Sequence, residues 1–163
     1  MSPSRAIALS AAAVAFLAGL AVALMPGEED DPEGAIRAVL AAAASAAEAG
    51  DLDGILEHVS DSFQSADGKK DDLKRVIFFE LRRRSWRKVF LVKTEVDLRD
   101  EARAKVTTGA ILARGEAPQS IAELNPTEVT AYRFELDFAL EDGRWRITSA
   151  AWRRAGFDEL VMR

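Results

Sequence analysis

The 163-residue chain contains no cysteine, a single histidine and a single tyrosine. Without cysteine it can form no disulfide, no thiolate nucleophile, no sulfur-ligated metal site and no acylated lipoprotein anchor. We interpret His58, the only histidine, as a residue at the edge of an apolar helix face rather than a catalyst or metal ligand. The net charge of −5 argues against nucleic acid as a partner, because binding to phosphates requires an excess of cations. The sequence therefore predicts no cofactor and no metal.

The longest stretch without a charge runs from Ala6 to Met25. About 20 residues at about 1.5 Å per residue just cross the roughly 30 Å hydrocarbon core of a bilayer. Arg5 precedes this stretch and the acidic run Glu28 to Asp31 follows it, so the positive-inside rule places the N-terminus in the cytoplasm. We predict a membrane-directing helix over residues 1–25, an acidic spacer over 26–33 and an extracytoplasmic domain over 34–163, in the periplasm or at the cell surface.

Two fates of this leader remain open. Its length favours a retained single-pass anchor, whereas its high content of alanine and the small-x-small site Ala21-Val22-Ala23 would suit a signal that is cleaved to release a secreted domain. A stripe of small residues recurs every fourth position and would let two copies pack closely as a homodimer, unless it only reflects an alanine-rich composition. The stripe consists of Ala11, Ala15, Gly19 and Ala23.

Three helices are predicted after the spacer. Asp31 followed by Pro32 is a typical helix start, and Gly50 a typical stop. Asp51 or Asp53 can cap a second, short helix. A third helix, over residues 71–84, carries a wide apolar stripe that predicts burial of much of its surface; the stripe comprises Leu73, Val76, Ile77, Phe79 and Leu81.

Beyond Trp86 the apolar period changes from that of a helix to that of a strand. Four segments alternate, and Asp142-Gly143 predicts a tight hairpin between the last two. The fold class is therefore α+β: three N-terminal helices packed on a curved, mainly four-stranded antiparallel sheet, preceded by one transmembrane or signal helix. The predicted inner positions are Phe90, Val92, Thr94, Val96 and Leu98, then Ala104 to Leu112, Tyr132 to Leu140, and Trp145 to Ser149, every second residue in each case. The opposite face is expected to be wet and charged.

Two motifs carry a resemblance to a known family. The junction Ala49-Gly50-Asp51-Leu52-Asp53-Gly54-Ile55-Leu56 resembles the helix-to-helix junction of the nuclear transport factor 2-like superfamily, which includes SnoaL-like and ketosteroid-isomerase-like proteins. The segment Glu141 to Ile147, with Trp152, resembles its closing strands. The resemblance covers roughly Pro32 to Ala155. It implies a sheet wrapped round the first helix as a cone-shaped α+β barrel with a pocket at its open end, in a superfamily of isomerases, dehydratases, cyclases, epoxide hydrolases and non-catalytic modules.

Enzymes of this superfamily place an Asp, Glu or His, often with a Tyr, on the concave face. Strand parity predicts different pocket-lining residues here, namely Tyr132, Thr94, Thr108, Phe134 and Ser149, with every strand carboxylate on the other face. A bulge could bring Glu95, Asp97, Glu135 or Asp137 inside. We therefore interpret the protein as a membrane-tethered extracytoplasmic binding or assembly module, non-catalytic, for a small apolar ligand or a second copy. The alternative is an isomerase- or dehydratase-type enzyme that uses the pocket.

Three further features have two interpretations each. The basic cluster at the end of the third helix either complements the helix dipole or contacts anionic lipid; it comprises Arg82, Arg83, Arg84, Arg87 and Lys88. The segment from Arg114 to Glu128 is either a lid over the pocket or a plain loop. The tail residues Phe157, Leu160 and Val161 either close the core or meet a partner.

Overall fold

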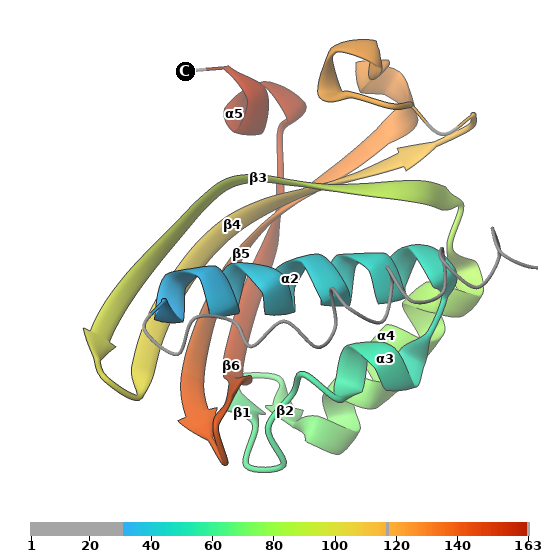
Figure 1. Ribbon diagram of the computed structural model, residues 1–163. Coiled ribbons are helices and arrows are strands. Elements are labelled where there is room, and N and C mark those ends of the chain that lie inside the picture. Colours follow the sequence, from blue (N-terminus) through green and yellow to red (C-terminus); the bar gives the residue numbers. More distant parts are fainter. Residues whose placement is uncertain (1–30, 117, 163) are drawn as a thin grey trace, which may run out of the picture. The chain divides into compact units, whose positions relative to one another are not determined.

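The computed structural model describes residues 31–116 and 118–162, and those from Glu33 onward form one compact unit. Helices α2 (Pro32–Ala49), α3 (Leu52–Leu56) and α4 (Lys70–Arg83) precede the main sheet (Figure 1), with the short strands β1 (Gln64–Ser65) and β2 (Gly68–Lys69) between α3 and α4. The predicted leader, Ala6 to Met25, lies outside the described residues. Within them, no helix combines the length and the apolar character needed to cross a membrane.

Helix α2 begins and ends where its sequence signals lie. Pro32 and Glu33, which we assigned to the spacer, form its first turn, and Gly50 follows its last residue with a φ of +71°, a value that favours glycine. Asp51 then caps α3, because its Oδ1 accepts a hydrogen bond from Gly54 N at 2.9 Å. Alanine has the highest helix propensity, so the alanine-rich α2 is a stable helix with few large side chains.

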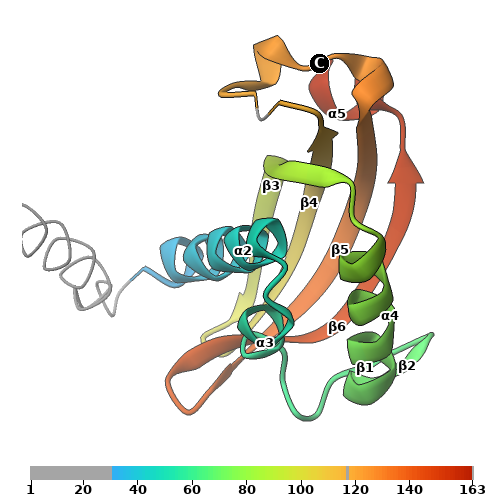
Figure 2. The same cartoon turned by 90° about the vertical axis from the view of Figure 1, so that its right-hand side faces the viewer.

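The main sheet is an antiparallel meander in the order β3-β4-β5-β6. Its strands are β3 (Trp86–Asp100), β4 (Arg103–Arg114), β5 (Val129–Glu141) and β6 (Arg144–Ala155), and two short 3-10 helices, η1 (Ile121–Glu123) and η2 (Pro126–Glu128), lie between β4 and β5. The strands are long and curved, with α2 crossing one face (Figures 1 and 2). Asp142 and Gly143 both have positive φ, as a two-residue hairpin turn requires, so this predicted hairpin is confirmed.

The main core lies between α2 and the sheet. Ile36 and Leu40 of α2 are buried against inner side chains of the last three strands. These are Ala104, Val106, Leu136, Phe138 and Trp145. The predicted α+β arrangement of helices on a four-stranded antiparallel sheet is confirmed, and the inward parity predicted for β4 and for most of β5 agrees with this core.

Two β-bulges change the parity predicted for the outer strands of the sheet. The register between β3 and β4 shifts between Val92 and Glu95, where Lys93 has a φ of +48°. Phe90 and Val92 therefore pack against Ile111 on the outer face, and our assignment of these two to the inner face is wrong. In β6 the register shifts between Ile147 and Ser149, after which Ala150 lies with the main core.

The C-terminal helix α5 (Phe157–Val161) covers one end of the outer face. Leu160 is buried in a small second core with Ile111 and Ala131. Lys93 Nζ holds the end of the helix by donating to the carbonyl oxygens of Glu159 at 2.8 Å and Met162 at 2.7 Å. The tail thus closes a core of its own, and the outer face is only partly the wet, charged surface that we expected.

Helix α4 differs from its prediction as well. No residue of α4 is fully buried, and Phe79, which we placed in its buried stripe, is 54% exposed. Of the basic cluster, Arg84 donates to the terminal carbonyl oxygens of α2 at Ala47 and Glu48, and Lys88 pairs with the Glu48 carboxylate at 3.2 Å. Arg82 lies over the ring of Phe78. Structural contacts therefore explain part of this cluster, and lipid contact remains a prediction.

Candidate functional site

A cavity of about 350 Å³ lies between the helices and the inner face of the sheet. Apart from Leu40, helix α2 contributes only alanines to the described wall, whereas α4 and the sheet contribute mostly larger side chains. Because Ala43, Ala44 and Ala47 reach only one carbon from the α2 backbone, they leave space that leucines would fill. Val76 and Glu80 of α4, both exposed, are also part of the wall, so the cavity reaches solvent along α4.

The wall is almost entirely hydrocarbon. The described lining residues that carry a polar side-chain atom are Glu80, Thr108, Tyr132, Trp86 and Trp152, and the indole nitrogen of Trp86 is itself inaccessible to solvent. The described lining residues include no lysine, arginine or histidine. Ligand pockets of proteins are typically about 300–1,000 Å³, mainly apolar, with a few placed polar groups. In size and lining this cavity falls in the lower part of that class.

Three of the five predicted pocket residues line the cavity: Thr108, Tyr132 and Phe134. Thr94 and Ser149 are not among the lining residues, because each lies next to a bulge that changes the parity of its strand. The Thr94 hydroxyl instead forms a hydrogen bond of 2.7 Å with the Thr108 hydroxyl. The four strand carboxylates that a bulge could have brought inside are exposed and absent from the lining; these are Glu95, Asp97, Glu135 and Asp137.

Sequence reasoning missed Glu80, the one carboxylate of the described lining. Its signal was present, since Glu80 follows Val76 by four residues and Ile77 by three and so shares their face of α4. We had scanned that helix for apolar residues only. Trp86 and Trp152 were missed for a different reason, because their places in the wall depend on where the outer strands bend.

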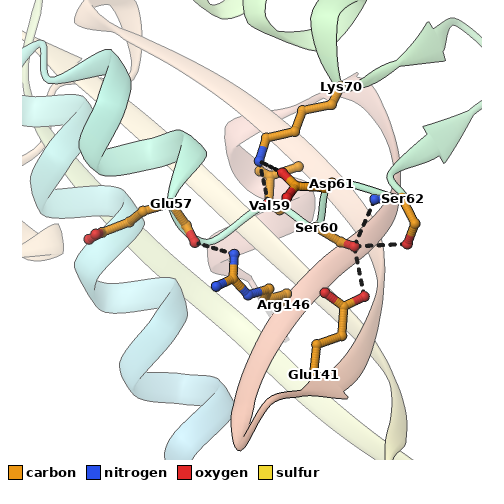
Figure 3. Close-up of polar contacts among 8 residues, drawn as sticks. All are labelled: Glu57, Val59, Ser60, Asp61, Ser62, Lys70, Glu141 and Arg146. Atoms are coloured by element: carbon orange, nitrogen blue, oxygen red, sulfur yellow. Dashed lines mark hydrogen bonds and ion pairs between the residues drawn. The ribbon is translucent and has the colours of Figure 1, made fainter.

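A polar cluster secures one wall of the cavity (Figure 3). The buried Ser60 donates to Glu141 Oε1 at 2.7 Å and bonds the Ser62 hydroxyl at 2.9 Å. Lys70 Nζ donates to Val59 O at 2.8 Å and to Asp61 Oδ1 at 2.7 Å. The hydrogen bond from Lys70 to Asp61 lowers the pKa of the Asp61 carboxyl. Since Val59 lines the cavity, we interpret the cluster as a structural support for that wall.

His58 lies outside the cavity lining and is mostly buried. Its Nε2 is 3.5 Å from Glu57 Oε1, and its carbonyl oxygen accepts from Ile147 N at 2.8 Å. Within residues 31–116 and 118–162, no three side chains of the His, Cys, Asp and Glu types gather as a metal site would require. In the described part of the chain, His58 thus acts through its backbone carbonyl, which helps to pair β6 with the segment after α3.

The described part of the segment between β4 and β5 lies away from the cavity wall. The described residues of Arg114 to Glu128 are absent from its wall, and Leu124 packs instead against the second core beside α5. Both interpretations of this segment, lid and loop, therefore concern a region away from the described cavity wall, and the lid remains a prediction.

Comparison with known proteins gives results only at the level of structure. No family model matches the chain. No curated protein matches it either. Among solved structures, a nuclear transport factor 2-like protein of unknown function from Shewanella oneidensis is 18% identical, with a TM-score of 0.59 over 75% of this chain and 98% of its own.

Two other solved structures carry names that refer to enzymes. A ketosteroid isomerase-like protein from Erwinia carotovora atroseptica is 14% identical, with a TM-score of 0.58 over 77% of this chain and 97% of its own. A scytalone dehydratase-like protein from Novosphingobium aromaticivorans is 11% identical, with a TM-score of 0.57 over 74% and 82%. The domain thus has the nuclear transport factor 2-like fold, as its junction and closing-strand motifs implied.

Proposed function

We propose that the domain is a non-catalytic module that binds a small apolar molecule in the cavity, and that the segment Ala6 to Met25 tethers it to the outer side of a membrane. The observation that supports binding is the hydrocarbon wall of a 350 Å³ space in a protein interior. Protein interiors are normally packed to crystal-like density, and apolar area exposed inside a cavity costs stability unless a ligand covers it.

Two substitutions on α2 test this function. Ala44 lines the cavity, whereas Ala42 is exposed on the same helix and is not part of the wall. Ala44→Phe should fill the space, and Ala42→Phe is a matched control that adds the same ring outside it. A panel of ten-carbon cyclic hydrocarbons and ketones should raise the Tm of the wild-type chain and of A42F but not that of A44F. A panel without effect on the wild-type Tm, or with equal effect on A44F, would contradict the proposal.

The membrane tether needs a separate experiment, because it depends on the leader alone. The intact mass and N-terminal residue of the mature protein, compared with Met1, distinguish a retained anchor from a cleaved signal. A retained anchor should also keep the protein in the membrane fraction through carbonate extraction. A mature N-terminus shortly after Ala23 would instead make it a secreted domain.

Glu80 favours a second candidate function, a small-substrate isomerase or dehydratase. It is the one carboxylate in the described cavity wall, and Tyr132 lines the same wall. A carboxylate within about 2.6–3.2 Å of an acidic C–H could remove that proton and return it to another carbon. A β,γ-unsaturated cyclic ketone would then convert to its conjugated isomer, visible by ultraviolet absorbance. Wild-type conversion that Glu80→Gln abolishes would support the enzyme; a wild-type rate no higher than the rates with E80Q and with buffer alone would exclude this reaction.

A further inference from the structure

Helix α4 exposes two adjacent aromatic rings to solvent. No residue of this helix is fully buried, and Phe78 and Phe79 are 41% and 54% exposed. Their rings meet edge to face, with 5.7 Å between centroids. They are the only aromatic side chains among the large apolar residues that the described part of the chain exposes. Because exposed apolar groups that lie together often mark a contact site, this side of α4 is a candidate interaction surface.

Four cations surround the two rings. Residues three or four apart share a face of a helix, so each ring lies between a basic residue one turn before it and another one turn after it. All four are exposed; they are Lys74, Arg75, Arg82 and Arg83. Arg82 Cζ lies 5.5 Å from the centroid of the Phe78 ring. Within residues 31–116 and 118–162, Arg75 alone of the four has a carboxylate partner, Asp72 at 3.5 Å. We call the two phenylalanines and these four cations the aromatic-basic face.

The mixture of rings and cations limits what can cover this face. A second copy that docked its own rings there about a two-fold axis would bring like charges together. Nucleic acid is disfavoured by the net charge of −5. An anionic bilayer suits both components, because rings can enter the boundary between headgroups and acyl chains while cations meet lipid phosphates. Asp71 and Asp72 oppose such contact only at the first turn of the helix.

We infer that α4 docks on an anionic lipid surface, with Phe78 and Phe79 inserted among the headgroups and the cations of the aromatic-basic face against lipid phosphates. This contact goes beyond the proposed tether, which would hold the domain near a bilayer without selecting the face that meets it. It does not depend on what the cavity binds. Since the cavity reaches solvent along α4, docking would also hold its opening beside the lipid.

A single fluorescent label can test this contact, because the chain has no cysteine of its own. Phe79→Cys carries a nitrobenzoxadiazole probe on the aromatic-basic face. Met162→Cys carries the same probe just after α5, which covers the outer face of the sheet, and Met162 is 61% exposed. The full chain is mixed with vesicles of phosphatidylcholine, with or without about 30% phosphatidylglycerol, that contain a nitroxide-labelled quencher lipid. The probe at position 79 should shift to shorter wavelength and be quenched in the anionic vesicles alone, and the probe at 162 in neither.

Two charge variants of the chain labelled at position 79 complete the design. Arg82→Gln with Arg83→Gln removes two cations, and each cation near an anionic surface contributes a factor of about five, so the ratio of docked to free α4 should fall about 25-fold. Arg99→Gln with Arg103→Gln makes the same change in net charge at exposed residues of β3 and β4 and should leave the ratio unchanged. None of these four arginines is buried, so both variants should keep the fold.

Flotation of the same samples separates this inference from the tether. A chain that floats with anionic vesicles while the probe at 79 stays unquenched would overturn docking through α4 and leave the tether standing. Flotation with anionic vesicles alone, with the probe at 79 quenched, would support docking and overturn the tether. Equal quenching at 79 and 162 would contradict the assignment to α4. A blue shift at 79, and not at 162, that rises with protein concentration in neutral vesicles would assign the face to a second copy instead.

Discussion

The two faces of the sheet carry two apolar layers that are packed to different degrees. On the inner face, a 350 Å³ space remains between the alanines of α2 and the large side chains of the strands. On the outer face, α5 is packed so closely that Gly109 has no room for a side chain, since a Cβ there would lie 2.8 Å from Leu160 Cδ2. The same sheet thus supports one filled core and one open one. Apolar composition alone does not decide which face encloses a cavity; the size of the facing side chains does.

The filled layer should be the more sensitive to loss of atoms. Leu160 is 1% exposed, and Leu160→Ala removes the central contact of α5 with Ile111 and Ala131. We expect a loss of about 2–5 kcal/mol in the free energy of unfolding, measured by urea denaturation. The control is Val161→Ala in the same helix, because Val161 is 39% exposed and its truncation should change stability by no more than about 0.5 kcal/mol. Equal effects of the two variants would show that α5 is not docked as described.

Adjacent residues of β4 test the difference in packing directly. Gly109 faces α5, and Ala110 lines the cavity on the opposite side of the strand. Gly109→Ala should cost about 1–3 kcal/mol, because the added methyl must displace Leu160 or Val92. Ala110→Val adds two carbons where space is available and should stay within about 0.5 kcal/mol of the wild type while it weakens ligand binding. Urea denaturation of both variants is the measurement, and a larger cost for A110V would indicate that the cavity is closed in solution.

The sequence predicted the inner layer better than the outer one. Pro32, Gly50 and Asp51 act through local backbone chemistry, so the ends of α2 and the start of α3 were readable, as was the hairpin at Asp142-Gly143. Lys93 carries no such signal, yet its positive φ reverses the parity of Phe90 and Val92 and creates the surface for α5. A bulge results from how two strands twist together, which alternation in one strand does not reveal.

The candidate site was predictable only in part for a related reason. Alternation placed Thr108, Tyr132 and Phe134 on the inner face of strands without a nearby bulge, and all three line the cavity. The cavity itself depends on a mismatch of side-chain volumes between α2 and the sheet, which has no period along the chain.

The smallest expected effect is a change in how the stability of the fold depends on pH, and it comes from an ion pair in the filled outer layer. Arg153 of β6 donates two hydrogen bonds to Glu159 of α5, and these lower the pKa of the Glu159 carboxyl below its ordinary value. A lowered pKa in the folded state stabilises the fold above the carboxyl's unfolded pKa, ordinarily about 4.3, and this contribution disappears as pH falls through the lower folded value. Glu159→Gln should therefore be less stable than the wild type at pH 7. The two chains should be equally stable at a pH low enough to protonate the Glu159 carboxyl of the wild type in both its folded and its unfolded state.

Because the Arg153–Glu159 pair is exposed, the difference should be small and reduced by salt. Lowered pKa values of Asp61 and Asp100 make the wild-type fold acid-sensitive as well, but both carboxylates are unchanged in E159Q and cancel in the comparison. Urea denaturation of both chains from pH 7 to pH 3 gives the measurement. Affinity of the cavity for the ten-carbon cyclic ketones of the binding panel should be the same in the two chains at pH 7, since Glu159 acts on the opposite face of the sheet. A parallel loss of affinity would show that docking of α5 and the shape of the cavity are coupled through the strands between them.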